Sequence, residues 1–220
     1  MQAILLDLDD TLIDEKNASR QAFLSFIAEN SSRFAAQDQQ DLFNQWRTLS
    51  QKYWLQFEQG EISFQNMRRQ RLRAFLAEPL ADSAADAIIS AYLKVYQASW
   101  QVLPEVADFL VLSKDIPKAI ISNGDREQQL QKITAMGLDA HIQIVITPID
   151  CGCFKPAYGI FKYALAQLGV AAEQTLMIGD CMIRDIQPAH ALGMHTFHVE
   201  PYSTSKNLVA ALESYGLVNC

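Results

Sequence analysis

Apolar positions after Pro104 follow two alternating patterns, one typical of helices and one typical of strands. Segments with apolar residues three and four positions apart alternate with short, continuous apolar runs of strand length. Pro104 suits the first turn of the first helix. The predicted elements are helix 104–114, strand 118–122, helix 126–136, strand 143–147, helix 157–168, strand 175–179, helix 185–192 and strand 194–199. Such repeated units predict an α/β fold with a doubly wound parallel sheet.

Residues from Asn17 to about Gln101 show the helical pattern throughout, without a convincing strand. One helix should bury Phe23, Phe26 and Ile27. A second helix carries apolar side chains three and four apart, namely Leu42, Phe43, Trp46, Leu49, Tyr53, Trp54 and Phe57. We expect Gly60 to end it, Ser63 to cap a third helix to about Ala77, and Ser83 with Asp86 to cap a fourth through Ser99. Four amphipathic helices predict a small bundle.

The bundle interrupts the sheet, because an apolar strand at Ala3–Leu6 precedes it. We therefore expect an α/β core domain at 1–14 and 102–220, with an α-helical cap domain inserted at 15–101.

Three acids follow that first strand, in Asp7-Leu8-Asp9-Asp10-Thr11-Leu12. Ligands of open α/β sheets bind at the carboxyl ends of the strands. Asp7 and Asp9 are two apart, so in extended backbone their side chains point the same way and repel each other. Either Mg²⁺ binds there or one acid is kept neutral. A turn or a helix cap would use the same residue types, and the segment alone does not decide.

Later strands also end in polar groups: Ser122-Asn123-Gly124, then Lys155-Pro156 before a helix, then Gly179-Asp180 with Asp185. The first set can donate hydrogen bonds to a phosphate, and Lys155 can add its charge to a helix start that faces an anion. The spaced acids of the last set suit Mg²⁺, which takes carboxylate oxygens together with phosphate oxygens.

The ordered set Asp7-x-Asp9-x-Thr11, Ser122-Asn123-Gly124, Lys155-Pro156 and Gly179-Asp180 through Asp185 resembles the four motifs of the haloacid dehalogenase (HAD) superfamily. The helical insertion after the first motif resembles the C1 cap of its subfamily I. Cys181 stands where serine is common, and Pro188 where glycine is usual. Neither change removes a catalytic group.

The resemblance implies a Rossmann-like core and a Mg²⁺-dependent phosphatase that works through an aspartyl-phosphate. In that mechanism Asp7 is the nucleophile, Asp9 protonates the leaving group and then activates water, and Ser122 and Lys155 stabilise the phosphoryl charge. The implied catalytic residues are Asp7, Asp9 and Lys155; the implied substrate-binding residues are Thr11, Ser122, Asn123 and Gly124; and the implied metal ligands are Asp7, Asp9, Asp180 and Asp185, the last of which could instead orient its neighbours.

Asp9 favours phosphate-ester hydrolysis over dehalogenation, because a halide leaves without a proton. Two alternatives stay open. A phosphomutase of the β-phosphoglucomutase type uses the same acids. A phospho-acceptor signalling module has a similar acidic cluster, although it needs neither a leaving-group acid nor a lid.

The predicted cap carries Arg68 and Arg71 beside an apolar stripe, with Arg69 and Arg73 on the opposite side of the helix. Arg71 is our candidate for substrate binding in the cap, and a salt bridge between cap helices is the alternative. The segment 54–71, with Ser122-Asn123-Gly124 and Gln129, resembles pyrimidine-type 5′-nucleotidases and N-acylneuraminate-9-phosphatases. That resemblance implies a nucleoside monophosphate or a sugar phosphate as substrate.

Composition narrows the partners. A net charge of −7 and a pI near 5.0 argue against binding to a nucleic-acid polymer. No apolar run is long enough to cross a membrane, and acids occupy the positions where a signal peptide would need apolar residues. We expect a cytoplasmic monomer or homodimer that binds a small phosphorylated metabolite. The cysteines, Cys151, Cys153, Cys181 and Cys220, have no zinc-site spacing and should be reduced thiols.

Overall fold

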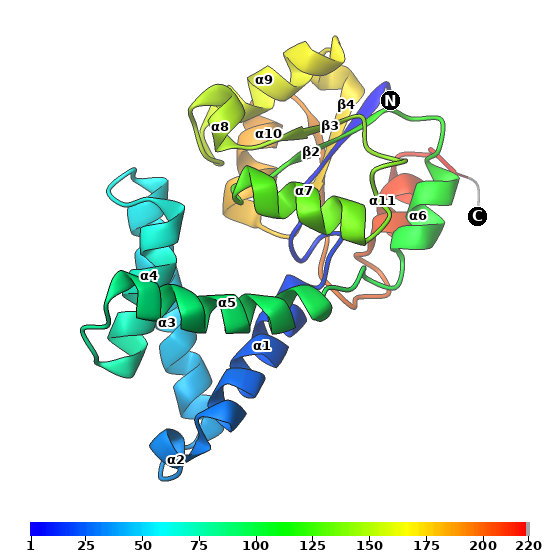
Figure 1. Cartoon of the computed structure of the whole chain (residues 1–220). Helices are drawn as coiled ribbons and strands as arrows, with labels where there is room; N and C mark the ends of the chain where they lie inside the picture. The colour runs from blue at the N-terminus through cyan, green and yellow to red at the C-terminus, as the bar shows by residue number, and fades with distance from the viewer. Residues whose placement is uncertain (219–220) are drawn as a thin grey trace. The chain divides into compact units, whose positions relative to one another are not determined.

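A computed structural model describes residues 1–218 of the chain (Figure 1), so Cys220 lies outside the described residues. The chain forms two compact units. Residues Met1–Glu15 and the segment from Trp100 onward form the α/β unit, and residues Lys16–Ser99 form the helical unit. Ile13 and Val102 form an antiparallel bridge, and the Asp14 N–H donates to the Gln101 carbonyl at 2.9 Å. The chain therefore leaves and re-enters the α/β unit at adjacent points.

The α/β unit is built on a five-stranded sheet in the order β3-β2-β1-β4-β5, with every neighbouring pair parallel. The strands are β1 (Ala3–Leu6), β2 (Lys118–Ile121), β3 (Ile144–Ile146), β4 (Thr175–Gly179) and β5 (His195–His198). The chain adds strands first on one side of β1 and then on the other, so the order reverses at β1. The predicted doubly wound sheet is confirmed, and this reversal at β1 is the position where sheets of this kind bind ligands.

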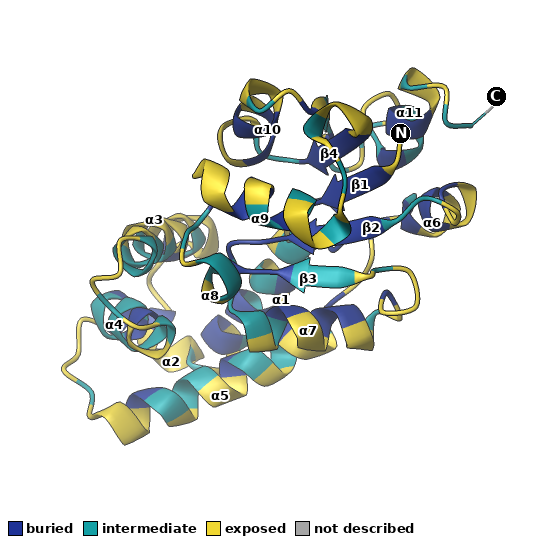
Figure 2. Cartoon of the chain, turned by 90° about the horizontal axis from the view of Figure 1, so that it is seen from above, coloured by how far each residue is buried: buried dark blue, intermediate teal, exposed yellow. Residues whose placement is uncertain are grey.

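Alternation along the strands builds a core on each face of the sheet. Ile4 and Leu6 pack with side chains of the helices α6 (Val106–Leu112), α7 (Arg126–Ala135) and α11 (Leu208–Ser214). Leu5 packs with side chains of α9 (Tyr158–Leu168) and α10 (Gln187–Ala191). The central strands are buried along their whole length, as their dark blue colour in Figure 2 shows. Apolar side chains on both faces explain why these strands read as continuous apolar runs in the sequence.

Helices of the α/β unit follow the predicted order, with differences at their ends. They are α6 (Val106–Leu112), α7 (Arg126–Ala135), α8 (Pro148–Cys151), α9 (Tyr158–Leu168), α10 (Gln187–Ala191) and α11 (Leu208–Ser214), with a 3₁₀ turn η1 (Ala172–Gln174) and a π-helical turn η2 (Met182–Ile186). Pro104 precedes α6 instead of lying in its first turn. The predicted helix 185–192 is in fact η2 followed by α10, and α8, η1 and α11 were not predicted.

The helical unit contains the predicted bundle. Its helices are α1 (Glu15–Glu29), α2 (Ser31–Phe34), α3 (Gln39–Glu58), α4 (Phe64–Leu76) and α5 (Asp82–Ala98). Phe23 and Phe26 are buried as expected, and the Ser63 hydroxyl caps α4 by accepting from the Asn66 N–H at 3.2 Å. The prediction for α5 was wrong at its start. Ala81 is its N-cap, and the Asp86 carboxylate accepts from the Arg69 guanidinium on α4.

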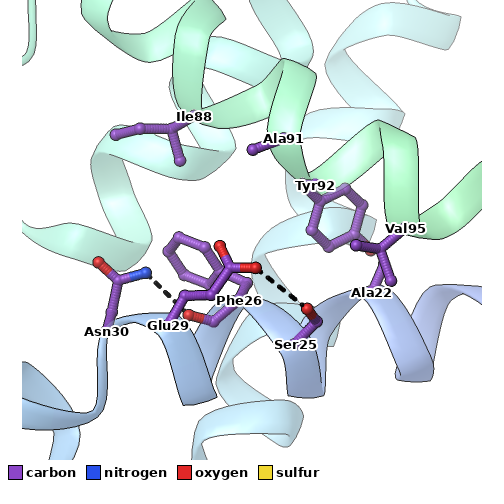
Figure 3. A pocket seen from close by; sticks show the side chains of 9 residues that line it. All are labelled: Ala22, Ser25, Phe26, Glu29, Asn30, Ile88, Ala91, Tyr92 and Val95. Atoms are coloured by element: carbon purple, nitrogen blue, oxygen red, sulfur yellow. Dashed lines mark hydrogen bonds between the residues drawn. The ribbon is translucent and has the colours of Figure 1, made fainter.

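A small pocket lies between α1 and α5 of the helical unit (Figure 3). Its lining is mainly apolar, with Phe26, Ile88 and Val95 prominent. The Ser25 hydroxyl donates to Glu29 at 3.3 Å at its edge. None of the residues that line it is a cation, so the pocket lacks a positively charged group that could bind a phosphate.

Among the described residues, no helix has both the length and the apolar character needed to span a membrane.

Candidate active site

The sheet register brings the first and fourth sequence motifs together. Because Leu6 on β1 pairs with Ile178 on β4, the residues that follow the two strands meet at the same sheet edge. The Thr11 hydroxyl links them. It donates to Asp7 Oδ2 at 3.0 Å and accepts from the Asp180 N–H at 3.1 Å. Thr11 therefore holds one carboxylate oxygen of Asp7 and the backbone of Asp180 in fixed positions.

Lys155 is the buried cation of this site. Its Nζ lies 2.6 Å from Asp7 Oδ1 and 2.6 Å from Asp185 Oδ1, and its side chain is 3% exposed. The Asn123 side chain fixes the Lys155 backbone in both directions. Asn123 Nδ2 donates to the Lys155 carbonyl at 2.8 Å, and the Lys155 N–H donates to Asn123 Oδ1 at 2.7 Å. The second motif thus sets the position of the third.

Three carboxylates converge here: one oxygen each from Asp7, Asp180 and Asp185 lie within 4.8 Å of one another. Asp185 reaches the group from the turn η2, where its Oδ2 accepts from the Cys181 N–H at 3.1 Å. Gly179 makes room for it, because a Cβ at position 179 would lie 2.6 Å from the Asp185 carboxyl. A side chain larger than hydrogen at Gly179 would displace this carboxylate.

Charge in the site is out of balance. Burial, together with the negative charges of Asp185 and Asp180, raises the pKa of Asp7 to about 7 against the lowering effect of Lys155. Burial alone would lower the pKa of Lys155, but Asp185 and Asp7 outweigh it and raise that pKa above its usual range. One ammonium does not neutralise three acids. A hard divalent cation with oxygen ligands fits this donor set.

Asp9 lies outside that group of three acids. Its Oδ1 accepts from Lys132 Nζ at 2.5 Å, and its Oδ2 accepts from Gln129 Nε2 at 2.7 Å. The role of Asp9 as a metal ligand stays a prediction, since its two carboxylate oxygens are already hydrogen-bonded in this arrangement. Its oxygens are directed to α7. The same Gln129 amide donates to Ser122 Oγ at 2.7 Å, so Asp9 is joined to the second motif.

The remaining predicted residues divide between the two units. Ser122 Oγ accepts from the Gly124 N–H at 3.1 Å, which shapes the loop after β2. Arg71 belongs to the helical unit, where its guanidinium lies 4.2 Å from the Trp46 ring centroid and donates to Ser50 Oγ at 3.3 Å. The salt bridges between helices α4 and α5 come from Arg69 and Arg73, which bind Asp82, with Arg69 also binding Asp86.

Sequence reasoning did not find Lys132. It lies on α7, three residues after Gln129, so the two side chains share one helical face. Both residues are buried. The helical spacing of these two polar residues after the Ser122-Asn123-Gly124 loop could have indicated that they act together. A lysine on a helix is ordinarily solvent-exposed, however, so its burial was not expected.

Cys151, Cys153 and Cys181 are free thiols, and the first two Sγ atoms are 3.5 Å apart.

Comparison with known proteins identifies the class that the fold and this site define. Residues 1–193 match the family model of the haloacid dehalogenase-like hydrolases. The chain belongs to that family and is a hydrolase, which confirms the resemblance of its four motifs.

Three relatives cover most of the chain. The HAD-hydrolase YfnB of Bacillus subtilis is 25% identical over 202 residues, covering 91% of this chain and 84% of YfnB. The crystal structure of YfnB bound to magnesium has a TM-score of 0.80 at 22% identity and covers 98% of both chains, which shows a shared fold. Phosphoserine phosphatase of Thermus thermophilus is 25% identical and covers 91% of this chain and 89% of its own. Human N-acylneuraminate-9-phosphatase is 25% identical, and the match covers 85% of this chain and 77% of that protein.

Proposed function

We propose that the chain is a Mg²⁺-dependent phosphatase that hydrolyses the phosphate monoester of a small metabolite through an aspartyl-phosphate on Asp7. The observation that carries this proposal is the placement of Lys155 Nζ, 2.6 Å from both Asp7 and Asp185. A buried ammonium beside a carboxylate nucleophile supplies positive charge where a transferring phosphoryl group becomes more negative. The relatives named as phosphatases support the same reaction class.

Asp7 and Asp9 divide the chemistry into two steps. In the first, an Asp7 oxygen bonds to phosphorus, the bond from phosphorus to the ester oxygen breaks, and the Asp9 proton goes to that oxygen. In the second, water attacks phosphorus and gives a proton to Asp9, while the bond between Asp7 and phosphorus breaks. Inorganic phosphate leaves, and both acids return to their starting states.

The residues of this chain suit a resident Mg²⁺. Asp7, Asp180 and Asp185 offer the oxygen donors, and the burial that raises the pKa of Asp7 disfavours its anion until a cation is bound. When bound, Mg²⁺ neutralises phosphate charge and keeps Asp7 ionised. Lys155 would remain the contact for the phosphoryl oxygens, and Ser122 would add a hydroxyl donor.

Asp9 supports ester hydrolysis rather than dehalogenation. An alkoxide is a poor leaving group until it is protonated, whereas a halide departs as a stable anion. A phospho-acceptor module would need no such acid, and it would need no inserted helical unit. The combination of Asp9 and the insertion therefore favours turnover of a small substrate over storage of a phosphoryl group.

The two units suit separate tasks in this proposal. The segments 1–14 and 102–220 would form the catalytic core, and residues 15–101 would form a cap that selects the leaving group. Arg71 is the candidate cap residue for contacting a polar or anionic part of the substrate. A nucleoside monophosphate or a sugar phosphate has the chemistry for these contacts.

Release of inorganic phosphate from p-nitrophenyl phosphate, with Mg²⁺ and with EDTA, tests the proposal. We expect turnover with Mg²⁺ only, and we expect Asp7→Asn to abolish it. A panel of nucleoside monophosphates and sugar phosphates then ranks substrates by kcat/KM. Absence of turnover throughout, or turnover that survives Asp7→Asn, would overturn the proposal. Conversion of a sugar phosphate into its isomer without phosphate release would assign a mutase instead.

A further inference from the structure

Helix α7 commits two buried polar side chains to one carboxylate. Lys132 Nζ binds Asp9 Oδ1 and the Gln129 amide binds Asp9 Oδ2, so a separate donor occupies each oxygen. Removing a lysine and a glutamine side chain from water is costly unless their polar groups find partners. A leucine or methionine at either position would fill the same space without that cost. The placement of these two residues therefore calls for an explanation beyond packing.

The arrangement leaves Asp9 usable. The side chain of Lys132 is 2% exposed, whereas that of Asp9 is 29% exposed. The carboxylate is thus held from the protein interior and remains open on another side. Each carboxylate oxygen has two lone pairs, so one donor per oxygen leaves a second lone pair that can carry a proton. The two donors fix the orientation of Asp9 without using its full capacity.

Gly124 has no side chain, and this leaves room for the Gln129 amide. A Cβ at position 124 would lie 2.2 Å from Gln129 Nε2, far inside contact distance. Gln129 also donates to Ser122 Oγ at 2.7 Å, so the amide that holds Asp9 also holds the hydroxyl of the second motif. Its own Oε1 is buried and accepts no hydrogen bond from any residue that the structure describes. The amide is placed for its two donations, even though its oxygen stays unpaired.

We propose that Lys132 and Gln129 are positioning residues that hold the Asp9 carboxylate in the orientation needed for proton transfer to the leaving group. The inference rests on the proposed phosphatase function and extends it to two residues outside the four motifs. An aspartate free to rotate about its side-chain torsions spends much of its time in unproductive rotamers. Two fixed donors remove that freedom, and orientation of a catalytic group contributes substantially to rate.

The experiment measures kcat/KM for two substrates that differ in leaving group, p-nitrophenyl phosphate and benzyl phosphate. Nitrophenolate leaves without a proton, whereas the benzyl alkoxide requires one. We expect Lys132→Met and Gln129→Leu to lower kcat/KM for benzyl phosphate by about 10- to 100-fold, and for p-nitrophenyl phosphate by less than about threefold. A loss of packing alone would lower both values equally.

A double-mutant cycle tests whether the two residues act through Asp9. In an Asp9→Asn background, we expect Lys132→Met to change kcat/KM for benzyl phosphate by less than about twofold, because the group that it orients is already lost. Gln131→Leu, at an exposed position on the same helix, is the matched control and should behave as the wild type.

The outcomes separate this inference from the proposed function. Equal losses on both substrates, or a full additional loss in the Asp9→Asn background, would overturn the positioning role while leaving the phosphatase proposal intact. A wild type that hydrolyses p-nitrophenyl phosphate but not benzyl phosphate would also overturn it. A wild type inactive on all phosphate esters would instead refute the proposed function. If Lys132→Met does not fold, as judged by circular dichroism, Gln129→Leu alone gives the same test at the other Asp9 oxygen.

Discussion

Asp7 is held in surroundings that oppose its ionisation. It is buried, and Asp180 and Asp185 lie beside it, so its pKa is raised from 3.8 to about 7. The folded protein therefore binds a proton here that the unfolded chain releases at lower pH. The stability gained from this proton is fully present below about pH 4 and is lost as the pH rises through about 7.

Replacing Asp7 with a neutral isostere should recover that stability. In the absence of metal, we expect Asp7→Asn to raise the free energy of unfolding by about 1–4 kcal/mol at about pH 8, and by less at about pH 5. Urea denaturation at the two pH values measures the difference. Asp139→Asn, at an exposed loop position, is the control and should change little at either pH. A destabilised Asp7→Asn protein at pH 8 would contradict the charge conflict.

Lys155 should matter more for rate than any exposed lysine. Lys155→Met removes the ammonium that contacts Asp7 and Asp185, and we expect kcat/KM for p-nitrophenyl phosphate to fall by about 100- to 1,000-fold. Steady-state kinetics checks this value. Lys162→Met makes the same replacement at an exposed position on α9 and should retain wild-type activity. Comparable losses in both variants would show that the effect is not specific to the site.

Asp7 and Asp180 could be predicted to lie close together because each directly follows a strand of one parallel sheet. Lys155 follows helix α8, and its place in the site was expected from the resemblance of the four motifs. The direction of the Asp9 side chain could not be predicted, because it depends on Lys132 and Gln129, more than a hundred residues later in the chain. Sequence spacing gives the position of a side chain but not its partner across the fold.

At the scale of elements, helix ends that are marked by a local signal were predicted best. Ser63 caps α4 through one hydrogen bond within its own turn, so the sequence contains the whole cause. The start of α5 has no side-chain cap, and Asp86, expected to help cap it, instead binds Arg69 on another helix. The turn η2 also has no local signal in the sequence, and it carries Asp185 to Lys155, which also contacts Asp7.

The capping assignments can be tested by a pair of serine substitutions. Ser63→Ala should lower the free energy of unfolding by about 1 kcal/mol, because the Asn66 N–H loses its acceptor. Ser83→Ala lies within α5 rather than at its cap, and it should be neutral or stabilising by a few tenths of a kcal/mol. Chemical denaturation of both variants gives the comparison. A larger loss of stability from Ser83→Ala than from Ser63→Ala would show that Ser83 does cap α5.

At the scale of the whole molecule, protons and Mg²⁺ should compete for the same carboxylate. Asp7 is protonated below about pH 7 in the metal-free protein, and a metal ligand must be ionised. We expect the apparent dissociation constant for Mg²⁺ to rise by up to about tenfold for each pH unit below 7 and to level off above about pH 8. Isothermal titration calorimetry across this range measures it. A dissociation constant independent of pH would exclude Asp7 as the competing group.

The bridge between Ile13 and Val102 joins the two ends of the helical insertion. The helical unit is one continuous insertion, and the chain segments that enter and leave it are paired with each other. The sequence of the insertion therefore does not affect the pairing of β1 with β2. A different insertion at this point would therefore leave Asp7 and Asp9 in place. Under the proposed function, changes in the helical unit would then alter substrate preference while the reaction stayed the same.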